Sequence, residues 1–178
     1  MKKSLQLLIF LILAVAVRIP AAAAQEDSVS SRYQIIVAYI YNFTQFTTWP
    51  SGAVGADFSV CVVGDNPFGP ALAVLRSRTV DDKKIVTKLY RSASGGMSAC
   101  NVLFVAESER GEIDEIMKTL KGAPVLTMSD MDGFVDGGGM VEFERNDQKV
   151  GIKIGLHAVQ TAGLAISSKL LRIANTAD

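Results

Sequence analysis

The sequence feature that most constrains the fold is a set of short apolar runs. Asp57 to Val63 reads as a buried strand, Val125 to Met128 reads as a further strand, and Asn101 to Ala106 is a continuous apolar run. Such runs are typical of strands buried on both faces of a helix-covered sheet. Between the last two of these runs along the chain, the pattern from Ser108 to Gly122 indicates a helix that Ser108 caps and Gly122 ends. Strands therefore alternate with a helix in this part of the chain.

Further segments extend this alternation on both sides. Lys84 to Tyr90 alternates as a strand does, and Pro70 to Leu75 reads as a short helix. Met140 to Glu144 and Val150 to Ile154 indicate an antiparallel hairpin, and an apolar terminal helix is expected over residues 157–173. The order predicts an α/β fold: a single layered domain whose Rossmann-like mixed sheet is flanked by helices, with a C-terminal antiparallel hairpin and a terminal core helix.

Residues 1–24 have the organisation of a cleaved signal peptide. A basic start at Lys2 and Lys3 precedes an apolar stretch from Leu5 to Val17, and small residues end at Ala24. The apolar stretch is too short to span a bilayer, so removal after Ala24 is expected, with an uncleaved anchor as the alternative. Residues 25–178 would then form one exported domain.

The charge balance of that domain excludes one class of partner. Removing Lys2, Lys3 and Arg18 leaves 15 basic and 18 acidic residues. A mildly acidic domain lacks the electrostatic footprint of a nucleic-acid-binding protein.

The first helix of the domain, expected from Arg32 until Trp49-Pro50 stops it, is unusually rich in aromatic residues. They do not all fall on one helical stripe, so some apolar surface should remain after one face has packed. We therefore expect a candidate partner or dimer surface; a helix buried on two sides of the core is the open alternative. The six residues are Tyr33, Tyr39, Tyr41, Phe43, Phe46 and Trp49.

Polar residues follow three of the predicted strands. Ligands of open α/β sheets bind beyond the carboxyl ends of the strands, so converging loops there would form an acidic pocket for a cation or a cationic ligand. The alternative, which we favour, is that these residues are turn and cap residues. The candidate pocket residues are Asp65, Asn66, Glu107, Ser108, Ser129 and Asp130.

The remaining motifs do not favour catalysis. Gly137-Gly138-Gly139 precedes a strand and fits a tight turn or bulge with positive φ, not a phosphate-binding loop. His157 is the only histidine, and Ser168 and Lys169 are adjacent on the expected helix, a poor geometry for a Ser–Lys pair. We expect no enzymatic activity and no cofactor.

Cys61 and Cys100 are the only cysteines. In an oxidising compartment an even pair is most simply a disulfide, and it would close a loop of roughly 40 residues, stabilising the fold by about 4 kcal/mol. Neither cysteine has a CxxC partner or a nearby histidine, so a zinc site or redox catalysis is poorly supported.

Several of these segments, kept in order, resemble the YfiR family of exported bacterial proteins. Together they extend over nearly all of residues 25–178. The matching segments are Ala38 to Phe43 with Trp49-Pro50, Val60 to Gly69, Ser98 to Val105 with Ser108-Glu109, Pro124 to Asp130 with Phe134, Gly138 to Met140, and Ala162 to Arg172.

The resemblance implies a periplasmic α/β regulator that dimerises. It also implies restraint of an inner-membrane diguanylate cyclase through the periplasmic domain of that cyclase, which lowers cyclic di-GMP signalling and biofilm formation. Cys61 and Cys100 match a family cysteine pair that forms a disulfide, whereas the second pair of some members is absent here between Asp136 and Lys153. The alternative function is a periplasmic sensor or carrier that binds a small ligand at the carboxyl ends of the strands.

Overall fold

The computed structural model describes residues 21–93, 95–146 and 149–177 of the 178-residue chain. It divides into two units, Met1–Ser31 and Arg32–Asp178. Of the first unit, the described part is the beginning of helix α2, which continues into the second unit as far as Phe46. Most of the predicted signal peptide, residues 1–20, lies outside the described residues.

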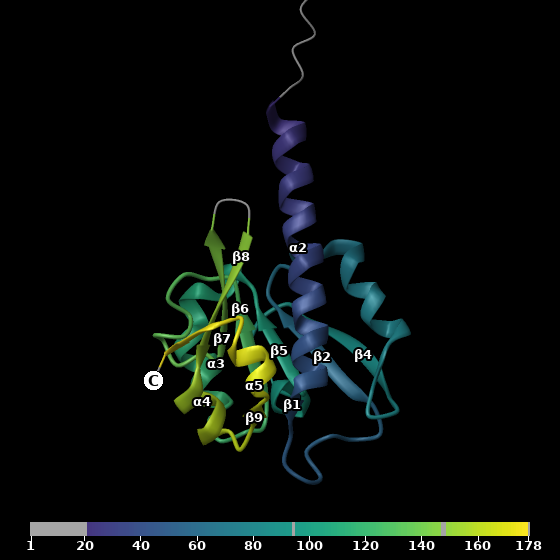
Figure 1. Cartoon of the computed structure of the whole chain (residues 1–178), viewed down its shortest axis with the longest axis vertical. Helices are drawn as coiled ribbons and strands as arrows, with labels where there is room; N and C mark the ends of the chain where they lie inside the picture. The colour runs from purple at the N-terminus through teal and green to yellow at the C-terminus, as the bar shows by residue number, and fades with distance from the viewer. Residues whose placement is uncertain (1–20, 94, 147–148, 178) are drawn as a thin grey trace, which may run out of the picture. The chain divides into compact units, whose positions relative to one another are not determined.

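Helices and strands alternate along the second unit (Figure 1). The strands are β1 Thr47–Thr48, β2 Phe58–Val63, β3 Thr79–Val80, β4 Lys83–Tyr90, β5 Val102–Val105, β6 Leu126–Ser129, β7 Val141–Asn146, β8 Lys149–Gly155, β9 Ala165–Ile166 and β10 Asn175–Ala177. The helices are α2 Ala21–Phe46, the 3₁₀ helices η1 Gly69–Ser77, η2 Met97–Ala99 and η3 Glu107–Glu112, and then α3 Ile113–Thr119, α4 Leu156–Thr161 and α5 Ser168–Leu171.

Eight of the strands form one sheet in the order β10-β8-β7-β6-β5-β2-β4-β3. Neighbouring strands from β4 through β7 run parallel, whereas β7 and β8 form an antiparallel hairpin and β3 pairs antiparallel with β4. The α/β class, the mixed sheet and the C-terminal hairpin predicted from the sequence are therefore confirmed.

The sheet separates two apolar cores because successive strand side chains point to opposite faces. In β2, Val60 and Val62 belong to the core on one face, whereas Cys61 and Val63 belong to the core on the other. The first core includes the buried face of α2, and the second includes Ile116 of α3. Burial on both faces explains why β2, β5 and β6 contain no charged residue.

Helix α2 packs on the sheet through one stripe. Ile36, Ile40 and Phe43 recur at three-to-four spacing and are fully buried. Figure 1 shows this part of α2 crossing the sheet in front of β2 and β5. After Phe46 the chain forms the short strand β1, which pairs antiparallel with β9 near the other end of the chain.

The predicted single terminal helix is wrong. Residues 157–173 instead contain two short helices, α4 and α5, with β9 between them. Gly163 adopts a φ of +72° and donates its N–H to Gln160, and Leu164 donates to Val159, so the chain reverses there. Such a reversal is the common way in which a glycine ends a helix. Apolar composition alone did not reveal this break.

The triple-glycine segment is a tight turn, as predicted, with Gly138 at a φ of +93°. The buried Glu142 carboxylate on β7 holds the loop before it by accepting the N–H groups of Gly133 and Val135 at 3.2 and 3.0 Å. Its two oxygens replace the backbone partners that the loop lacks.

No helix in the part of the chain that the structure describes is long and apolar enough to cross a bilayer.

Candidate functional site

The strand order reverses at β2, which lies between β4 and β5. Crevices at such reversals are the usual ligand sites of open α/β sheets. The loops that follow β2 and β5 meet there, because the Asp65 N–H donates to the Ser108 Oγ at 2.9 Å. The prediction that Ser108 caps a helix is wrong. Ser108 lies within η3, and its hydroxyl joins the two loops instead.

The carboxylates expected to converge at this reversal are divided among different partners. Glu107 is exposed and forms a bidentate pair with Arg110, at 2.5 and 2.8 Å. The hydrogen bond to Glu107 is the main cause of a raised pKa of Arg110, which stays charged. Arg110 also donates to the Asp132 carbonyl oxygen at 3.3 Å. Glu107 is thus paired with its own cation on the surface.

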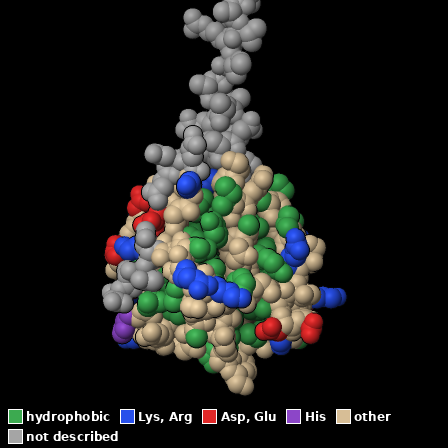
Figure 2. All heavy atoms as spheres, viewed as in Figure 1, with side chains coloured by type: hydrophobic (Ala, Val, Ile, Leu, Met, Phe, Trp, Pro, Cys, Tyr) green, Lys and Arg blue, Asp and Glu red, His purple; other side chains and the backbone are tan. Residues whose placement is uncertain are grey.

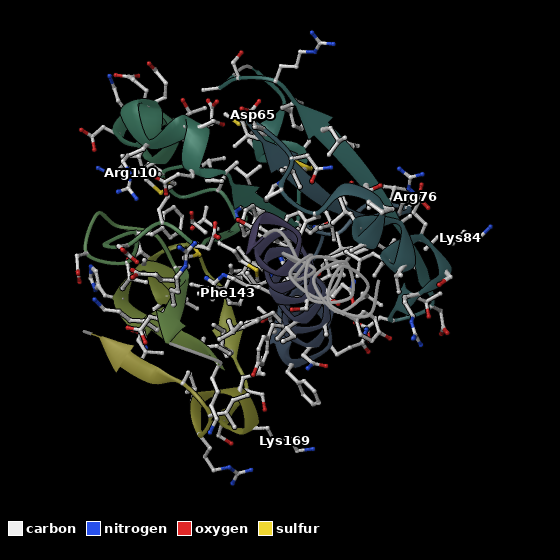
Figure 3. The ribbon with its side chains drawn as sticks, turned by 90° about the horizontal axis from the view of Figure 1, so that it is seen from above. Asp65, Arg76, Lys84, Arg110, Phe143 and Lys169 are labelled. Carbon is white, nitrogen blue, oxygen red and sulfur yellow. A yellow bond between two sulfur atoms is a disulfide. The ribbon has the colours of Figure 1, made fainter. Side chains whose placement is uncertain are left out.

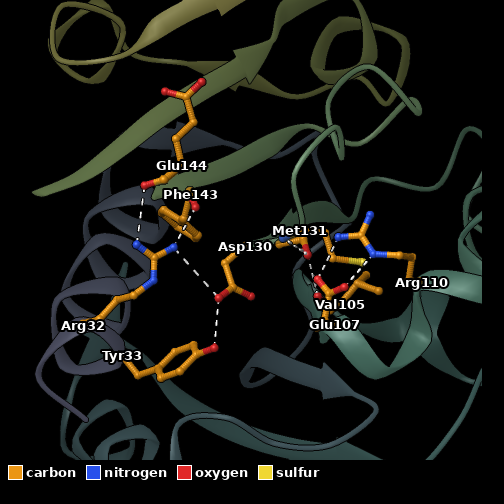
Figure 4. Close-up of polar contacts among 10 residues, drawn as sticks. Arg32, Tyr33, Val105, Glu107, Arg110, Asp130, Met131, Phe143 and Glu144 are labelled. Atoms are coloured by element: carbon orange, nitrogen blue, oxygen red, sulfur yellow. Dashed lines mark hydrogen bonds and ion pairs between the residues drawn. The ribbon is translucent and has the colours of Figure 1, made fainter. Parts of the chain in front are cut away.

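Asp130, at the end of β6, instead faces α2 (Figure 4). It accepts a hydrogen bond from the Tyr33 hydroxyl at 2.9 Å and lies 3.9 Å from the Arg32 guanidinium. Arg32 also donates to the carbonyl oxygens of Phe143 and Glu144, at 2.9 and 3.5 Å. These contacts tie α2 to the end of β6 and to the middle of β7.

The Tyr33 hydroxyl is held in its neutral, donating form. Burial first, and then the negative charge and hydrogen bond of Asp130, together raise the pKa of Tyr33 to about 12, although the nearby Arg32 and Arg145 lower it. An ionised phenol beside Asp130 would place two negative charges 2.9 Å apart. The contact therefore has one stable protonation state at neutral pH.

The other candidate pocket residues act within the backbone of their own loops. The Asn66 Oδ1 accepts the Phe68 N–H at 3.1 Å, as in an Asx turn. The buried Ser129 hydroxyl donates to Val105 at 2.7 Å and accepts the Met131 N–H at 3.1 Å. Residues 21–93, 95–146 and 149–177 contain no group of three His, Cys, Asp or Glu side chains that could hold a metal ion. Ligand binding at these loops stays a prediction.

One acidic residue at the reversal was not singled out from the sequence. Glu109 is buried, and its side chain packs beneath Gly64 at the end of β2. A Cβ at Gly64, which has a φ of +89°, would collide with Ser108 and lie 2.8 Å from the Glu109 Cγ. Glycine is thus required for the two loops to close. The sequence gives no signal for this role of Glu109, because an acidic residue in the first turn of a helix is already explained by the positive helix end.

The aromatic residues of the first helix are mostly core residues. Phe43 is fully buried, Tyr39 stacks on Phe143, and Trp49 packs edge-on against Phe58. These contacts favour the alternative of a helix packed on more than one side. On the face drawn in Figure 2, apolar side chains form separate patches among polar ones.

Phe46 is the exception among the aromatic candidates, since it is 37% exposed. Lys169 of α5 lies over its ring, with the Nζ 5.6 Å from the centroid. Ile35 is also exposed on α2. A partner surface on this helix would therefore include Phe46 and Ile35 but not all six aromatic candidates. The partner surface stays a prediction.

The disulfide predicted between Cys61 and Cys100 is confirmed. It joins β2 to Cys100, two residues before β5, in the core beneath α3. Both cysteines are buried. The bond closes the segment that contains β4, so it fixes the connection between the two central strands.

The serines and the histidine considered for catalysis lie on the surface near the chain end. His157 is exposed on α4. The Ser167 Oγ accepts the Lys169 N–H at 3.3 Å and caps α5, whereas Ser168 is exposed. The helix predicted there is broken, and these residues lie on separate short helices.

A family model described as YfiR/HmsC-like matches residues 33–175, which include every strand of the sheet except the last two residues of β10. No curated protein matches the chain significantly.

Proposed function

Because the chain belongs to the YfiR/HmsC-like family, we propose that it is a periplasmic regulatory protein that restrains an inner-membrane diguanylate cyclase. It binds the periplasmic domain of the cyclase, and this binding lowers cyclic di-GMP and biofilm formation. The observation that carries the proposal is the family match over residues 33–175. The buried disulfide agrees with an exported protein, since such bonds persist in oxidising compartments.

The proposed activity is binding without catalysis. The one histidine, His157, is exposed on α4, and Ser167 is used as a helix cap. A regulator of this kind acts through the difference in its affinity for two states of the cyclase. It must therefore bind the inactive state more tightly than the active one.

Deletion of the gene, followed by measurement of cyclic di-GMP, tests the regulatory claim. Deletion should raise cyclic di-GMP, and expression of the intact protein should restore the original level. A version without residues 1–24, retained in the cytoplasm, is the matched control and should fail to restore it. Unchanged cyclic di-GMP after deletion would contradict the proposal.

Capture of membrane proteins on the purified protein tests the partner. A membrane protein with a cyclase domain should be retained, and its periplasmic segment alone should bind. If the membrane fraction yields no cyclase or other membrane sensor, the partner claim fails.

We further propose that the protein is a homodimer with Phe46 at or near the interface. Phe46 is the most exposed of the aromatic candidates, and Ile35 is exposed on the same helix. Light scattering should give twice the monomer mass, and Phe46→Ser should reduce it to the monomer value. Phe43→Leu in the core is the control and should leave the mass unchanged. A monomeric intact protein would contradict this proposal.

A second candidate function is sensing a small cationic ligand at the strand ends. The observation that favours it is the Asp65–Ser108 contact, which brings two loops together where the strand order reverses. Ligand binding to the folded state raises the melting temperature. A thermal-shift screen of amines and divalent cations should show a shift that Asp65→Asn removes and Asp57→Asn, an exposed control, retains. A screen without any such shift would remove this candidate.

A further inference from the structure

The outer edge of the sheet at β4 is open over most of its length. β3 covers β4 only at two positions, where Thr79 pairs with Lys84 and Val80 pairs with Lys83. β4 continues to Tyr90, and β2 pairs with its other side. Beyond Ile85, the edge has no strand partner within the part of the chain that the structure describes. An edge of this kind is a template for an added strand.

Thr87 and Leu89 direct their backbone N–H and C=O groups outward on this edge, as the hydrogen bonds of their neighbours on β4 indicate. The carbonyl oxygen of Tyr90 accepts the Gly64 N–H at 2.9 Å, so Tyr90 faces β2. The N–H of Ile85 donates to Arg78 at 3.2 Å on the opposite side. Because backbone groups alternate in direction along a strand, Thr87 and Leu89 face outward like Ile85. They present two N–H and two C=O groups to a partner.

Exposed apolar side chains lie beside these backbone groups. Leu89 is 59% exposed, and it pairs in register with Val62, whose side chain lies in the core that includes η1. On η1, Val74 is 55% exposed. The Arg76 Nε donates to the Thr87 Oγ1 at 2.8 Å and holds η1 against β4. Leu89 and Val74 thus offer apolar contacts on the face of the open edge that η1 covers.

The charge around the edge is strongly positive. Residues 76–91 contain six Lys and Arg but two Asp and Glu, whereas the rest of the chain has 12 basic and 16 acidic residues. The exposed cations include Arg76, Lys84, Lys88 and Arg91. In Figure 3, Arg76 and Lys84 project from the same side of the molecule. The basic surface is therefore a local feature of this edge, since the whole chain has no net charge.

We propose that the outer edge of β4 binds an extended acidic segment of another protein, which adds a strand to the sheet. The backbone of that segment bonds to Thr87 and Leu89, and every second side chain rests on Leu89 and Val74. Its carboxylates pair with Lys84 and Lys88. Main-chain bonds supply affinity in this binding mode, while side chains supply selectivity.

A second copy of this chain does not fit the edge. Pairing of β4 with another β4 would set Lys84, Lys88 and Arg91 of one copy against the same cations of the other. Like charges across a strand pair are destabilising, and edge lysines generally prevent self-association. The positive charge of the edge therefore disfavours pairing with β4 of a second copy and favours an acidic strand. This proposal does not depend on the identity of the membrane partner proposed above.

A labelled peptide tests the proposal on the purified protein. The probe is a peptide of about eight residues, the length of a strand, in which glutamate alternates with valine. Its binding is followed by fluorescence anisotropy. Two control peptides replace every glutamate by lysine or methylate the backbone nitrogens along one edge. The acidic peptide should bind, and both controls should bind at least about tenfold more weakly.

Charge-reversal variants locate the site. Lys84→Glu with Lys88→Glu should lower the affinity by about tenfold or more, because it removes the complementary charge. Lys118→Glu with Lys121→Glu makes the same change in net charge at exposed positions of another region and should retain binding. Amide exchange at Thr87 and Leu89 should slow when the acidic peptide is added.

Several results would overturn the proposal. Equal loss of affinity in both reversal variants would show that the peptide responds to the net charge of the protein and not to the β4 edge. Equal binding of the backbone-methylated peptide, or unchanged exchange at Thr87 and Leu89, would exclude an added strand. Binding of vesicles of anionic lipid that requires Lys84 and Lys88, without binding of the peptide, would assign the edge to a membrane surface instead.

Discussion

Replacing Tyr33 with phenylalanine isolates one contact between α2 and the sheet. The Tyr33 hydroxyl donates to Asp130 at 2.9 Å, while its ring packs edge-on against Phe68 at 5.5 Å. The substitution keeps the ring and removes the donor, so Asp130 is left with Arg32 at 3.9 Å. A hydrogen bond to a charged group stabilises by about 1.5–3 kcal/mol. Because Tyr33 is half-buried, we expect Tyr33→Phe to lower the free energy of unfolding by about 1–2 kcal/mol.

The loss should depend on pH in a defined direction. Burial, then Asp130, raises the pKa of Tyr33 from 10.0 to about 12 in the folded protein. Between these values the folded state keeps a proton that the unfolded chain has lost, so stability falls as pH rises. The contribution is fully present below about pH 10 and is lost as pH passes through about 12. The stability difference between Tyr33→Phe and the intact protein should therefore shrink across this window.

Urea unfolding followed by far-ultraviolet circular dichroism measures both effects, at about pH 8 and about pH 11. Tyr41→Phe is the matched control, since the Tyr41 ring lies 5.5 Å from Arg78 and its hydroxyl forms no hydrogen bond with the residues that the structure describes. Its stability difference should be small at both pH values. A Tyr33→Phe difference below about 0.3 kcal/mol at the lower pH, or one that stays constant at the higher pH, would refute the reasoning.

Three further substitutions test separate features by urea unfolding. Glu142→Gln should cost about 2–3 kcal/mol, because an amide oxygen and a donor NH₂ replace two acceptors facing Gly133 and Val135; Glu144→Gln, the control, should cost far less. Gly155→Ala should cost about 1–3 kcal/mol, since its Cβ would lie 2.9 Å from the Gly139 carbonyl oxygen, whereas Gly111→Ala has open space; equal effects would contradict this. Asp82→Gly should stabilise by about 0.5–1 kcal/mol by relieving a φ of +65° in the β3–β4 turn, and a loss would show that the aspartate is not strained.

The sequence predicts the buried strands well because their pattern depends on local surroundings. β2, β5 and β6 are buried on both faces and contain no charged residue, so each could be recognised without knowing its neighbours. The disulfide could also be predicted, since Cys61 and Cys100 are the only cysteines of the sequence. Local chemistry was sufficient in these cases.

The roles of the polar residues could not be predicted in the same way. Asp130 looked like a residue of a strand-end pocket, but its partner Tyr33 lies 97 positions away and arrives with α2. Glu109 and Ser108 are placed by a close approach at Gly64, which depends on two separate loops. The break at Gly163 was missed because the residues on both sides are apolar enough to read as one helix. The failures at Asp130, Ser108 and Glu109 concern contacts between segments distant in sequence, whereas the break at Gly163 is a local helix end.

The pairing of β1 with β9 has a consequence for how the chain acquires its fold. Thr47 finds its partner Ile166 only after nearly all of the chain is available, and the Ser167 N–H then donates to Phe46 at 2.8 Å. In a chain that emerges N-terminus first during synthesis or export, the end of α2 would therefore lack these contacts until β9 has emerged. Contacts so far apart in sequence slow folding. Until then the end of α2 at Phe46 lacks these contacts, and a chaperone that binds exposed apolar residues could act on it during that interval.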